Sequence, residues 1–412
     1  MTETDALQAG SGARPANDPT PTGGTGARAI PVVSGLRMKM LRVGIWQHLA
    51  LQASRLYSSP KAALTALRML AQVRETAAGG LQPRKYVVVG GRTFFSLRAP
   101  GFPSPAFDRF AAEELNRVVP FRPGSGLLTP ILAVTKRCNL HCAHCSEWDT
   151  LRQPDTLSVE DLLAIAGRLR ASGATQLQIS GGEPLLRLDA VEALCRDGRD
   201  TCDLWILTSG TPLTAEVTQC LRSAGATGVM VSLDHWDPAA HDAFRGASGT
   251  FSRAVEGIGH AAEAGLVVGL SLTARRDFVS AENLEAYARL VQTLGVSFIQ
   301  LLEPRAVGRW AGADVALTDE QVTLLEAFDR SMNQDRLDMP LVDYPGRGQR
   351  RDGCWGAGDR YLFVDADGGL HACPFCRGAM GSGLAESLDD LRDRLRARGC
   401  QMFRPACVKP VS

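Results

Sequence analysis

The sequence predicts an α/β fold, because six short apolar segments alternate with helical segments between about Leu128 and residue 312. Repeated units of this kind form a parallel sheet, which can curl into a partial (βα)6 TIM-like barrel. A helical N-terminal region precedes this part of the chain, and a small Cys-rich C-terminal domain follows it.

Changes in composition divide the chain into five segments. Residues 1–30 are rich in Gly, Pro, Thr and Ala, which predicts a disordered tail. Residues 36–126 form a basic helical region with a β-hairpin, and residues 127–312 form the partial barrel. Residues 313–350 are expected to be a helical linker, and residues 351–412 the Cys-rich domain.

Length, charge and cysteine content narrow the class of protein. The 412 residues, 45% of them hydrophobic, can bury a large core. The formal net charge is +1, which argues against nucleic acid as the main partner. No secretory segment and no apolar run of ~20 residues is visible, and the 11 cysteines are an odd number at metal-binding spacings. We therefore expect a cytoplasmic location, in a reducing compartment.

The segment from Leu36 to Ala78 has a helical pattern that breaks near Ser59-Pro60. Its charge is one-sided, with Glu75 opposed by a set of cations, namely Arg37, Lys39, Arg42, Arg55, Lys61, Arg68 and Arg74. A basic amphipathic stretch can bind an anionic membrane surface or an acidic partner. Residues 36–78 are thus a candidate peripheral membrane contact, and the alternative is a helical pair packed on the barrel.

Two β-type runs between Tyr86 and Leu97 flank Gly90-Gly91, which predicts a hairpin. It could be the edge of a small accessory domain.

The barrel strands are expected at Ile131 to Thr135, Leu177 to Ser180, Leu204 to Thr208, Val229 to Leu233, Val267 to Thr273, and Phe298 to Leu302. Ligands of parallel α/β sheets bind at the carboxyl ends of the strands. Residues that follow these segments are therefore the candidates for the site.

Three cysteines, Cys138, Cys142 and Cys145, follow the first strand. Three thiolates at this spacing can hold a 4Fe–4S cluster while leaving one iron without a protein ligand, and an open iron can bind a reactant. The cationic side chains of Lys136 and Arg137 would lie beside the anionic cluster. The alternative is a structural zinc site, with His141 or His144 as the fourth ligand.

The second strand leads into Gly181-Gly182-Glu183-Pro184. Two glycines let the backbone approach a ligand closely, and a carboxylate can accept a hydrogen bond from an ammonium group. With the cysteine triplet, this segment resembles the radical S-adenosylmethionine (SAM) superfamily, over about two thirds of the chain. The resemblance implies that Gly181 to Pro184 hold the methionyl amino group of SAM.

The resemblance extends to later strand ends. Thr208 and Ser209 match a Thr-Asn-Gly segment near SAM, with Ser209 in place of Asn. Ser232 and Asp234 match a Ser-x-Asp segment near the ribose and methionyl end, and Arg245 matches an arginine that pairs with the SAM carboxylate.

His144 occupies a position that is usually aromatic in this family and stacks near adenine. Ser271 and Thr273 lie on the fifth strand, and Glu303 and Arg305 would point toward substrate or form an ordinary loop ion pair.

The C-terminal segment resembles the family's auxiliary-cluster domain of the SPASM/twitch type. The resemblance rests on Cys354, Gly368 and Cys373, with a hairpin from Tyr361 to Ala372. The candidate ligands of one auxiliary 4Fe–4S cluster are Cys354, Cys373, Cys376, Cys400 and Cys407, of which at most four can bind. A zinc knuckle is the alternative.

The remaining cysteines, Cys195, Cys202 and Cys220, are expected to be buried small hydrophobic residues.

The resemblance implies an enzyme that reductively cleaves SAM to methionine and a 5'-deoxyadenosyl radical, which abstracts hydrogen from an unactivated carbon. A reductant such as flavodoxin or ferredoxin would supply the electron. The first hypothesis for the substrate is a peptide or protein side chain that is oxidatively modified, and the second is a small metabolite or membrane lipid. A non-catalytic iron–sulfur electron carrier is a third, although a carrier needs no open iron.

Overall fold

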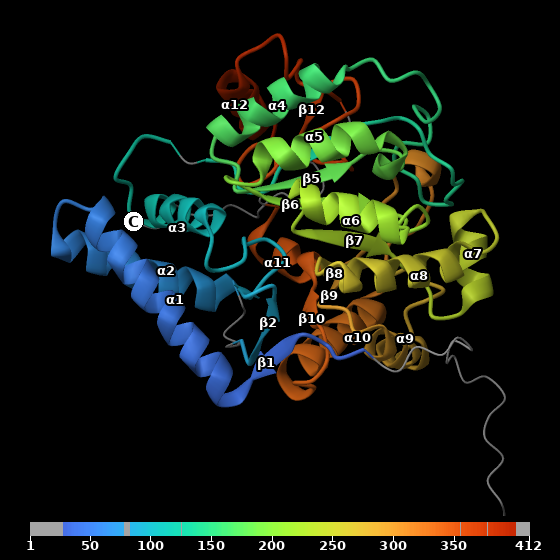
Figure 1. Cartoon of the computed structure of the whole chain (residues 1–412), viewed down its shortest axis with the longest axis horizontal. Coiled ribbons are helices and arrows are strands. Elements are labelled where there is room, and N and C mark those ends of the chain that lie inside the picture. Colours follow the sequence, from blue (N-terminus) through green and yellow to red (C-terminus); the bar gives the residue numbers. More distant parts are fainter. Residues whose placement is uncertain (1–27, 78–82, 125, 355, 377, 401–412) are drawn as a thin grey trace, which may run out of the picture.

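The computed structural model describes residues 28–77, 83–124, 126–354, 356–376 and 378–400. Its larger sheet has nine strands in the order β10-β9-β8-β7-β6-β5-β4-β11-β12, and a smaller sheet has three strands in the order β1-β2-β3 (Figure 1). The predicted α/β class with a parallel barrel sheet is confirmed by the parallel pairing from β4 to β10.

The six barrel strands are β4 (Ile131–Ala133), β5 (Gln176–Ser180), β6 (Asp203–Thr208), β7 (Gly228–Ser232), β8 (Val267–Thr273) and β9 (Phe298–Leu302). They lie where the apolar segments predict them, within one or two residues at each end. The connecting helices are α4 (Val159–Ala171), α5 (Leu188–Gly198), α6 (Ala215–Ala224), α7 (Pro238–Arg245), α8 (Thr250–Glu263) and α9 (Ala281–Leu294). Figure 1 shows these helices on the outside of the sheet.

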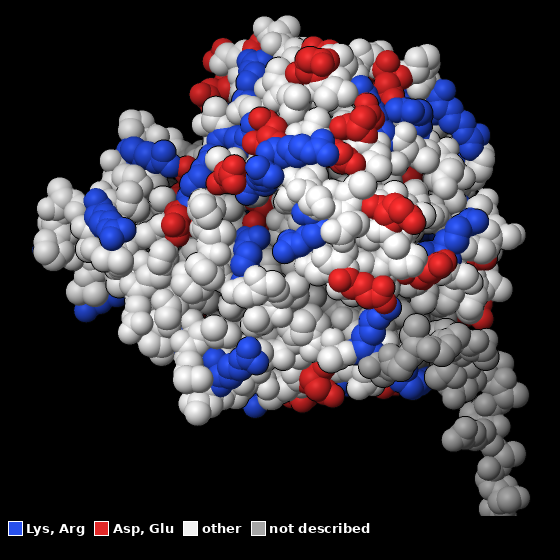
Figure 2. Space-filling model, viewed as in Figure 1, with Lys and Arg blue, Asp and Glu red and all other residues white. Residues whose placement is uncertain are grey.

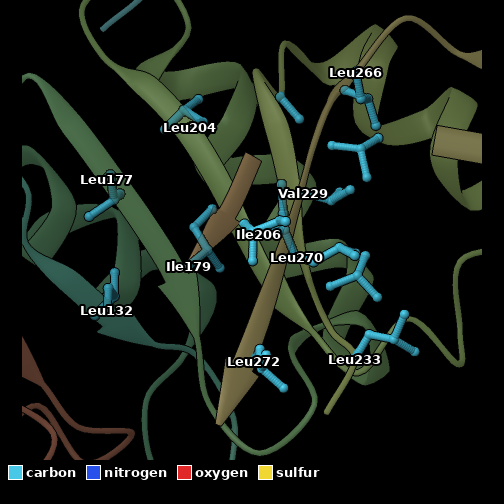
Figure 3. Packing of buried hydrophobic residues seen from close by; sticks show 14 of the residues in the cluster. Leu132, Leu177, Ile179, Leu204, Ile206, Val229, Leu233, Leu266, Leu270 and Leu272 are labelled. Atoms are coloured by element: carbon cyan, nitrogen blue, oxygen red, sulfur yellow. The ribbon is translucent and has the colours of Figure 1, made fainter. Parts of the chain in front are cut away.

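Alternation along the strands gives the sheet two different faces, since successive side chains point to opposite sides. Outward residues such as Ile179, Ile206 and Leu270 are fully buried against the helices (Figure 3). Inward residues include Gln178, Ser271 and Gln300, and these line a large cavity. The hydrophobic effect thus stabilises the outer layer and leaves polar side chains for the interior of the barrel.

The N-terminal region contains the predicted helical pair and hairpin. The elements are β1 (Val32–Ser34), α1 (Gly35–Leu56), α2 (Pro60–Ala77), β2 (Lys85–Val89), β3 (Arg92–Phe94) and α3 (Pro105–Val118). The helix break at Ser59-Pro60 and the turn at Gly90-Gly91 are confirmed. The three helices pack around their own apolar cluster, which includes Ile45 and Phe107.

The small sheet closes the amino end of the barrel. Val87, Phe94 and Leu97 pack there against the inward-facing Trp205 and Phe298. Closure at this end leaves the carboxyl ends of the strands as the place for a site.

The segment predicted as a helical linker differs from that expectation, because it also contains a strand. The short helix η2 (Gly308–Trp310) lies just before this segment. The segment itself contains α10 (Asp319–Arg330), the π-helix η3 (Ser331–Asp335), β10 (Leu341–Asp343) and most of α11 (Pro345–Asp352). The strand β10 pairs in parallel with β9 and extends the sheet. A strand of three residues is too short to be recognised in the sequence from the alternation of apolar and polar residues.

The C-terminal hairpin, predicted between Tyr361 and Ala372, is confirmed as β11 (Phe363–Val364) and β12 (Leu370–His371). It joins the barrel sheet, since β11 pairs in parallel with β4. The helix α12 (Leu388–Arg398) follows.

One further expectation falls largely outside the described residues, and another needs correction. Most of the tail lies outside the described residues, but Arg28 at its end forms an ion pair with Glu263 at 2.6 Å. Cys195 and Cys202 are buried as expected, whereas Cys220 is exposed on α6, because it falls on the helix face turned away from the sheet. Among the described helices, none combines the length and apolar character that crossing a bilayer requires.

Candidate active site

A cavity of about 830 Å³ occupies the barrel interior and reaches the carboxyl ends of the strands. Most of the predicted site residues line it, namely Cys138, Cys142, His144, Cys145, Gly181, Gly182, Glu183, Thr208, Ser209, Ser232 and Arg245, together with Ser271, Thr273, Glu303 and Arg305. Asp234 and Pro184 do not line it and are buried behind it. The fold therefore brings residues at the ends of six strands to one place.

Gly181 and Gly182 allow the loop after β5 to lie against the cysteine loop, where a side chain would not fit. A Cβ on Gly182 would lie 2.3 Å from the Arg137 carbonyl oxygen and 3.0 Å from the Cys138 Cβ. A Cβ on Gly308, which has φ +58°, would lie 2.2 Å from the Cys145 carbonyl oxygen. The cysteine loop is thus pressed between two backbones that tolerate no side chain.

The expectation that Lys136 and Arg137 serve as cations beside the thiols is wrong in this structure. Lys136 is buried and forms an ion pair with Asp367 at 2.5 Å, and Arg137 pairs with Asp155 at 3.1 Å. Carboxylates thus neutralise both side chains, and their contacts brace the loop. Lys136 also ties the cysteine loop to the turn of the C-terminal hairpin.

Arg245 is the cation that contacts a thiol, with Nη1 3.6 Å from Cys142 Sγ. Its other terminal nitrogen donates to Asp234, and both residues are buried. Burial opposes either charge, but the pairing lowers the pKa of Asp234 to about 2 and raises the pKa of Arg245. Asp234 therefore positions Arg245, and its carboxylate also accepts from the Thr273 amide at 2.8 Å.

Glu183 is almost fully buried, and protein donors occupy its carboxylate. One oxygen accepts from Thr208 Oγ1 at 2.7 Å and from the Leu185 amide at 3.3 Å. The other accepts from the amide and the hydroxyl of Ser209, at 2.8 and 2.6 Å. Burial raises the pKa of Glu183, against the effect of these bonds. The carboxylate thereby joins the ends of β5 and β6.

His144 stacks on Phe244, with ring centroids 4.5 Å apart and planes 10° apart, and Trp310 lies 5.8 Å away. Burial lowers the pKa of His144 to about 4, so the ring is neutral at pH 7. The predicted aromatic role of this position is compatible with such a stack.

The thiols fit the ligand set of an iron–sulfur cluster, in which thiolates bind iron. Burial raises the pKa of Cys138, and it raises the pKa of Cys145 to about 11, so a bound metal would be needed to hold these thiolates. Two buried nitrogens beside them, His144 Nδ1 and Arg245 Nε, have no hydrogen-bond partner in the structure. Among the described residues, no three His, Cys, Asp or Glu side chains lie close enough together to bind a single metal ion.

The C-terminal cysteines gather beside the main cavity. Cys354, Cys373 and Cys400 line a smaller cavity of about 60 Å³, which shares Glu303 and Arg305 with the main one. Cys376 is buried, and its hydrogen bond with Cys373, together with burial, raises the pKa of the Cys373 thiol. Cys407 lies outside the described residues. Three of the five predicted cysteines thus border one small cavity, and a fourth, Cys376, contacts Cys373.

Several residues of the site were not anticipated. Arg187 is buried behind the cysteine loop, where it donates to the carbonyls of Val134 and Leu157 at 2.7 and 2.6 Å. Asp155 accepts from the Lys136 amide and from Thr135 Oγ1. Residues this far from the cysteines in sequence carry no pattern that would connect them to the loop.

The N-terminal helices also form part of the cavity wall. Leu49 on α1, Leu70 and Arg74 on α2, and Phe110 on α3 line its far end. Arg74 stacks on Phe95, with its guanidinium carbon 4.8 Å from the ring centroid. The cavity thus runs from the thiols to a largely apolar wall, on which Arg74 lies among a few other charged residues.

Three thiols, a buried carboxylate and a guanidinium surround one cavity of this partial α/β barrel. Such a site belongs to the class of barrel proteins that hold an iron–sulfur cluster at the strand ends. Residues 132–294 match the model of the Radical SAM superfamily. This part of the chain is a radical SAM domain.

Curated relatives include an AdoMet-dependent heme synthase of Nitratidesulfovibrio vulgaris, 30% identical over 47% of this chain and 51% of that protein. Another is the mycofactocin maturase MftC of Mycolicibacterium smegmatis, 29% identical over 61% of this chain and 66% of that protein. The chain therefore spans about half to two thirds of the length of these relatives.

Among solved structures, Streptococcus suis SuiB bound to the precursor peptide SuiA has a TM-score of 0.55 at 14% identity, covering 82% of this chain and 79% of that one. The enzyme anSMEcpe with bound AdoMet and a peptide has a TM-score of 0.52 at 16% identity, covering 64% and 80%. These likenesses concern the fold.

Proposed function

We propose that this chain is a radical SAM enzyme that abstracts hydrogen from an unactivated carbon, for the oxidative modification of a peptide or protein side chain. The observation that carries the proposal is the single cavity shared by Cys138, Cys142, Cys145, Glu183 and Arg245. Its volume of about 830 Å³ lies within the range of roughly 300–1,000 Å³ that small-molecule sites occupy.

In this proposal Cys138, Cys142 and Cys145 hold a 4Fe–4S cluster. When bound, the cluster supplies the electron that splits SAM into methionine and the 5'-deoxyadenosyl radical. A small electron-transfer protein such as flavodoxin or ferredoxin would reduce it, in the cytoplasm.

In this proposal the protein's own side chains bind SAM and orient it. The Arg245 guanidinium, which Asp234 holds in place, is suited to a carboxylate of SAM by its bidentate geometry. The stacked rings of His144 and Phe244 offer a flat apolar surface for adenine. Gly181 to Glu183 and the strand ends at Thr208, Ser209 and Ser232 complete the SAM pocket, and Pro184 supports this segment from behind.

The relatives support a peptide as substrate. MftC is named a maturase, SuiB was solved with a precursor peptide, and anSMEcpe with a peptide. A cavity that extends beyond the thiols to the N-terminal helices has room for a side chain next to SAM. Ser271, Thr273, Glu303 and Arg305 lie on its wall and would contact the substrate.

The apolar far end of the cavity supports a second candidate, an amphipathic small molecule or lipid. Leu49, Leu70 and Phe110 could bury an alkyl chain, and Arg74 could meet an anionic group. The chain of a lipid gains free energy from such a wall, whereas a polar peptide gains little.

We also propose that the C-terminal cysteines form a twitch-type domain with an auxiliary 4Fe–4S cluster. The gathered thiols of Cys354, Cys373, Cys376 and Cys400 support this, with Cys407 as a further candidate. The cavity of about 60 Å³ is small, so the case depends on the thiols and not on the volume. A cluster there could take an electron from the substrate, which favours net oxidation.

The test of the main proposal compares Cys142→Ala with Cys220→Ala after anaerobic reconstitution with iron and sulfide. Cys220 is an exposed cysteine outside the site and is the matched control. With SAM and dithionite, the wild type and Cys220→Ala should form 5'-deoxyadenosine and show the absorption of an iron–sulfur cluster. Cys142→Ala should lose at least about 100-fold of the rate and part of the iron, because a cluster ligand is missing.

A wild type that holds iron but forms no 5'-deoxyadenosine would identify an electron carrier and refute the enzyme. Undiminished cleavage by Cys142→Ala would refute the ligand assignment.

The auxiliary cluster is tested by the iron content of Cys373→Ala, again beside Cys220→Ala. Loss of one ligand should reduce the iron by one cluster, about four atoms per chain. SAM cleavage should persist in part, since Cys138, Cys142 and Cys145 are intact. Unchanged iron in Cys373→Ala, or zinc in the wild type, would contradict an auxiliary iron–sulfur site.

A further inference from the structure

The helices α1 and α2 carry most of the exposed large apolar side chains of the described residues. Seven of the ten lie there, namely Leu36, Met40, Val43, Leu51, Leu64, Met69 and Val73. Leu36 is 74% and Met40 59% exposed. Monomeric proteins seldom leave such a set in water without a partner.

The spacing places the α1 members on one stripe. Leu36, Met40 and Val43 follow at intervals of four and three residues, which is one side of a helix. The opposite side of the same helix, with Ile45 and Leu49, is buried against α2 and α3. The outer stripe is therefore an additional apolar face, beyond the one that packs the helix.

Cations border this apolar face. The exposed ones are Arg37, Lys39, Arg55, Lys61 and Arg68, and none has an ion-pair partner among the described residues. Glu75 is the one acidic residue in the sequence of the two helices. In Figure 2 the lobe that contains α1 and α2 is mostly white with separate blue groups.

We propose that the outer face of α1 and α2 docks on the surface of an anionic lipid bilayer. Apolar side chains that enter the headgroup region, with unpaired cations beside them for anionic headgroups, are the features of interfacial helices. A second copy of the chain fits less well, because a two-fold contact would bring the same cations face to face.

The helices of the docking face also contribute residues to the cavity. Val73 is 39% exposed and also lines the cavity, and the neighbouring Leu70 and Arg74 lie on the cavity wall. Docking would therefore hold at the membrane two helices whose inner sides line the cavity. This inference concerns where the protein sits and does not depend on the radical chemistry.

The experiment is sedimentation of the full chain with vesicles, at low ionic strength. One set contains phosphatidylcholine with 30% phosphatidylglycerol, and the other phosphatidylcholine alone. We expect binding to the anionic vesicles that weakens with added salt, and little binding to the neutral ones. Met40→Glu should lose at least about tenfold in affinity, because it places a charge on the apolar stripe.

Leu384→Glu is the matched control, since Leu384 is also exposed, at 36%, but lies far along the chain in the C-terminal segment. It should bind as the wild type does. Lys39→Ala and Arg68→Ala should each weaken binding about fivefold. Circular dichroism on all variants separates lost docking from lost folding.

Three outcomes would overturn the proposal. They are a chain that stays in the supernatant with anionic vesicles, equal binding to both vesicle types, and identical behaviour of Met40→Glu and Leu384→Glu. A dimer by light scattering that Met40→Glu dissociates, without vesicle binding, would assign the face to self-association instead.

Discussion

Glu183 shows how one buried residue can serve the local fold and the site together. A carboxylate has about four acceptor positions, and Thr208, Ser209 and Leu185 use them. The glutamate side chain therefore fixes this part of the cavity wall, through the ends of two adjacent strands. The sequence predicts a carboxylate that accepts from an ammonium group, and it does not indicate that these neighbouring protein donors contact the carboxylate.

Replacement of Glu183 by Gln should turn one acceptor oxygen into a donor that faces the donors of Ser209 or Thr208. We expect a loss of about 1–3 kcal/mol in the free energy of unfolding, with weaker SAM binding, because a buried donor is left unpaired. Thermal melts and calorimetric titration with SAM measure the two effects. Ser209→Ala, which removes one of several donors, should have a smaller effect, and an unchanged Glu183→Gln would disprove this role.

Secondary-structure elements are joined by buried polar side chains as well as by apolar packing. Lys85 on β2 is fully buried, and its Nζ donates to the carbonyl oxygens of Met332, Arg336, Met339 and Pro340 at 2.6–2.9 Å. These carbonyls end the π-helix η3 and lead into β10. Burial lowers the pKa of Lys85 to about 7, while the four carbonyls favour its charged form.

Lys85→Met keeps the side-chain length and removes the donors, so several buried carbonyls lose their partner. We expect a loss of about 3 kcal/mol in stability and faster amide hydrogen exchange in β2 and β10. Lys39→Met, on the exposed side of α1, is the control and should leave both unchanged. Equal exchange rates in the wild type and Lys85→Met would contradict this connection.

On the scale of the whole molecule, residues from distant segments border one cavity. The N-terminal helices form its far wall, β10 and α11 its side, and the C-terminal hairpin continues the sheet from β4. Asp329 on α10 is one of the buried groups on this wall and pairs with Arg347 on α11 at 3.1 Å. Burial raises the pKa of Asp329 to about 6, in spite of Arg347.

This pKa gives the stability of the molecule a pH dependence with a definite sign. The folded state binds the Asp329 proton more tightly than the unfolded chain does, for which the pKa is about 3.8. Its stabilising contribution is complete below about pH 4 and is lost as the pH rises through about 6. Between pH 4 and 7, the free energy of unfolding of the wild type should therefore fall by up to about 3 kcal/mol relative to that of Asp329→Asn.

Melting temperatures of the two proteins across this range provide the measurement. Asp319→Asn, an exposed position on the same helix, is the matched control. A constant difference between wild type and Asp329→Asn at every pH would contradict the prediction.

Local patterns determined the parallel strands, the cysteine triplet with its glycine-rich partner, and both hairpins, because apolar alternation and ligand spacing act over a few residues. Only the tertiary structure decided which cation contacts a thiol. Lys136 forms an ion pair with Asp367, and Arg137 forms one with Asp155. Arg245 is the residue that contacts Cys142. The tertiary structure also decided that β10 extends the sheet and that the N-terminal helices line the cavity. Contacts of this kind join residues far apart in the chain, and their energies depend on burial and distance, which no local pattern encodes.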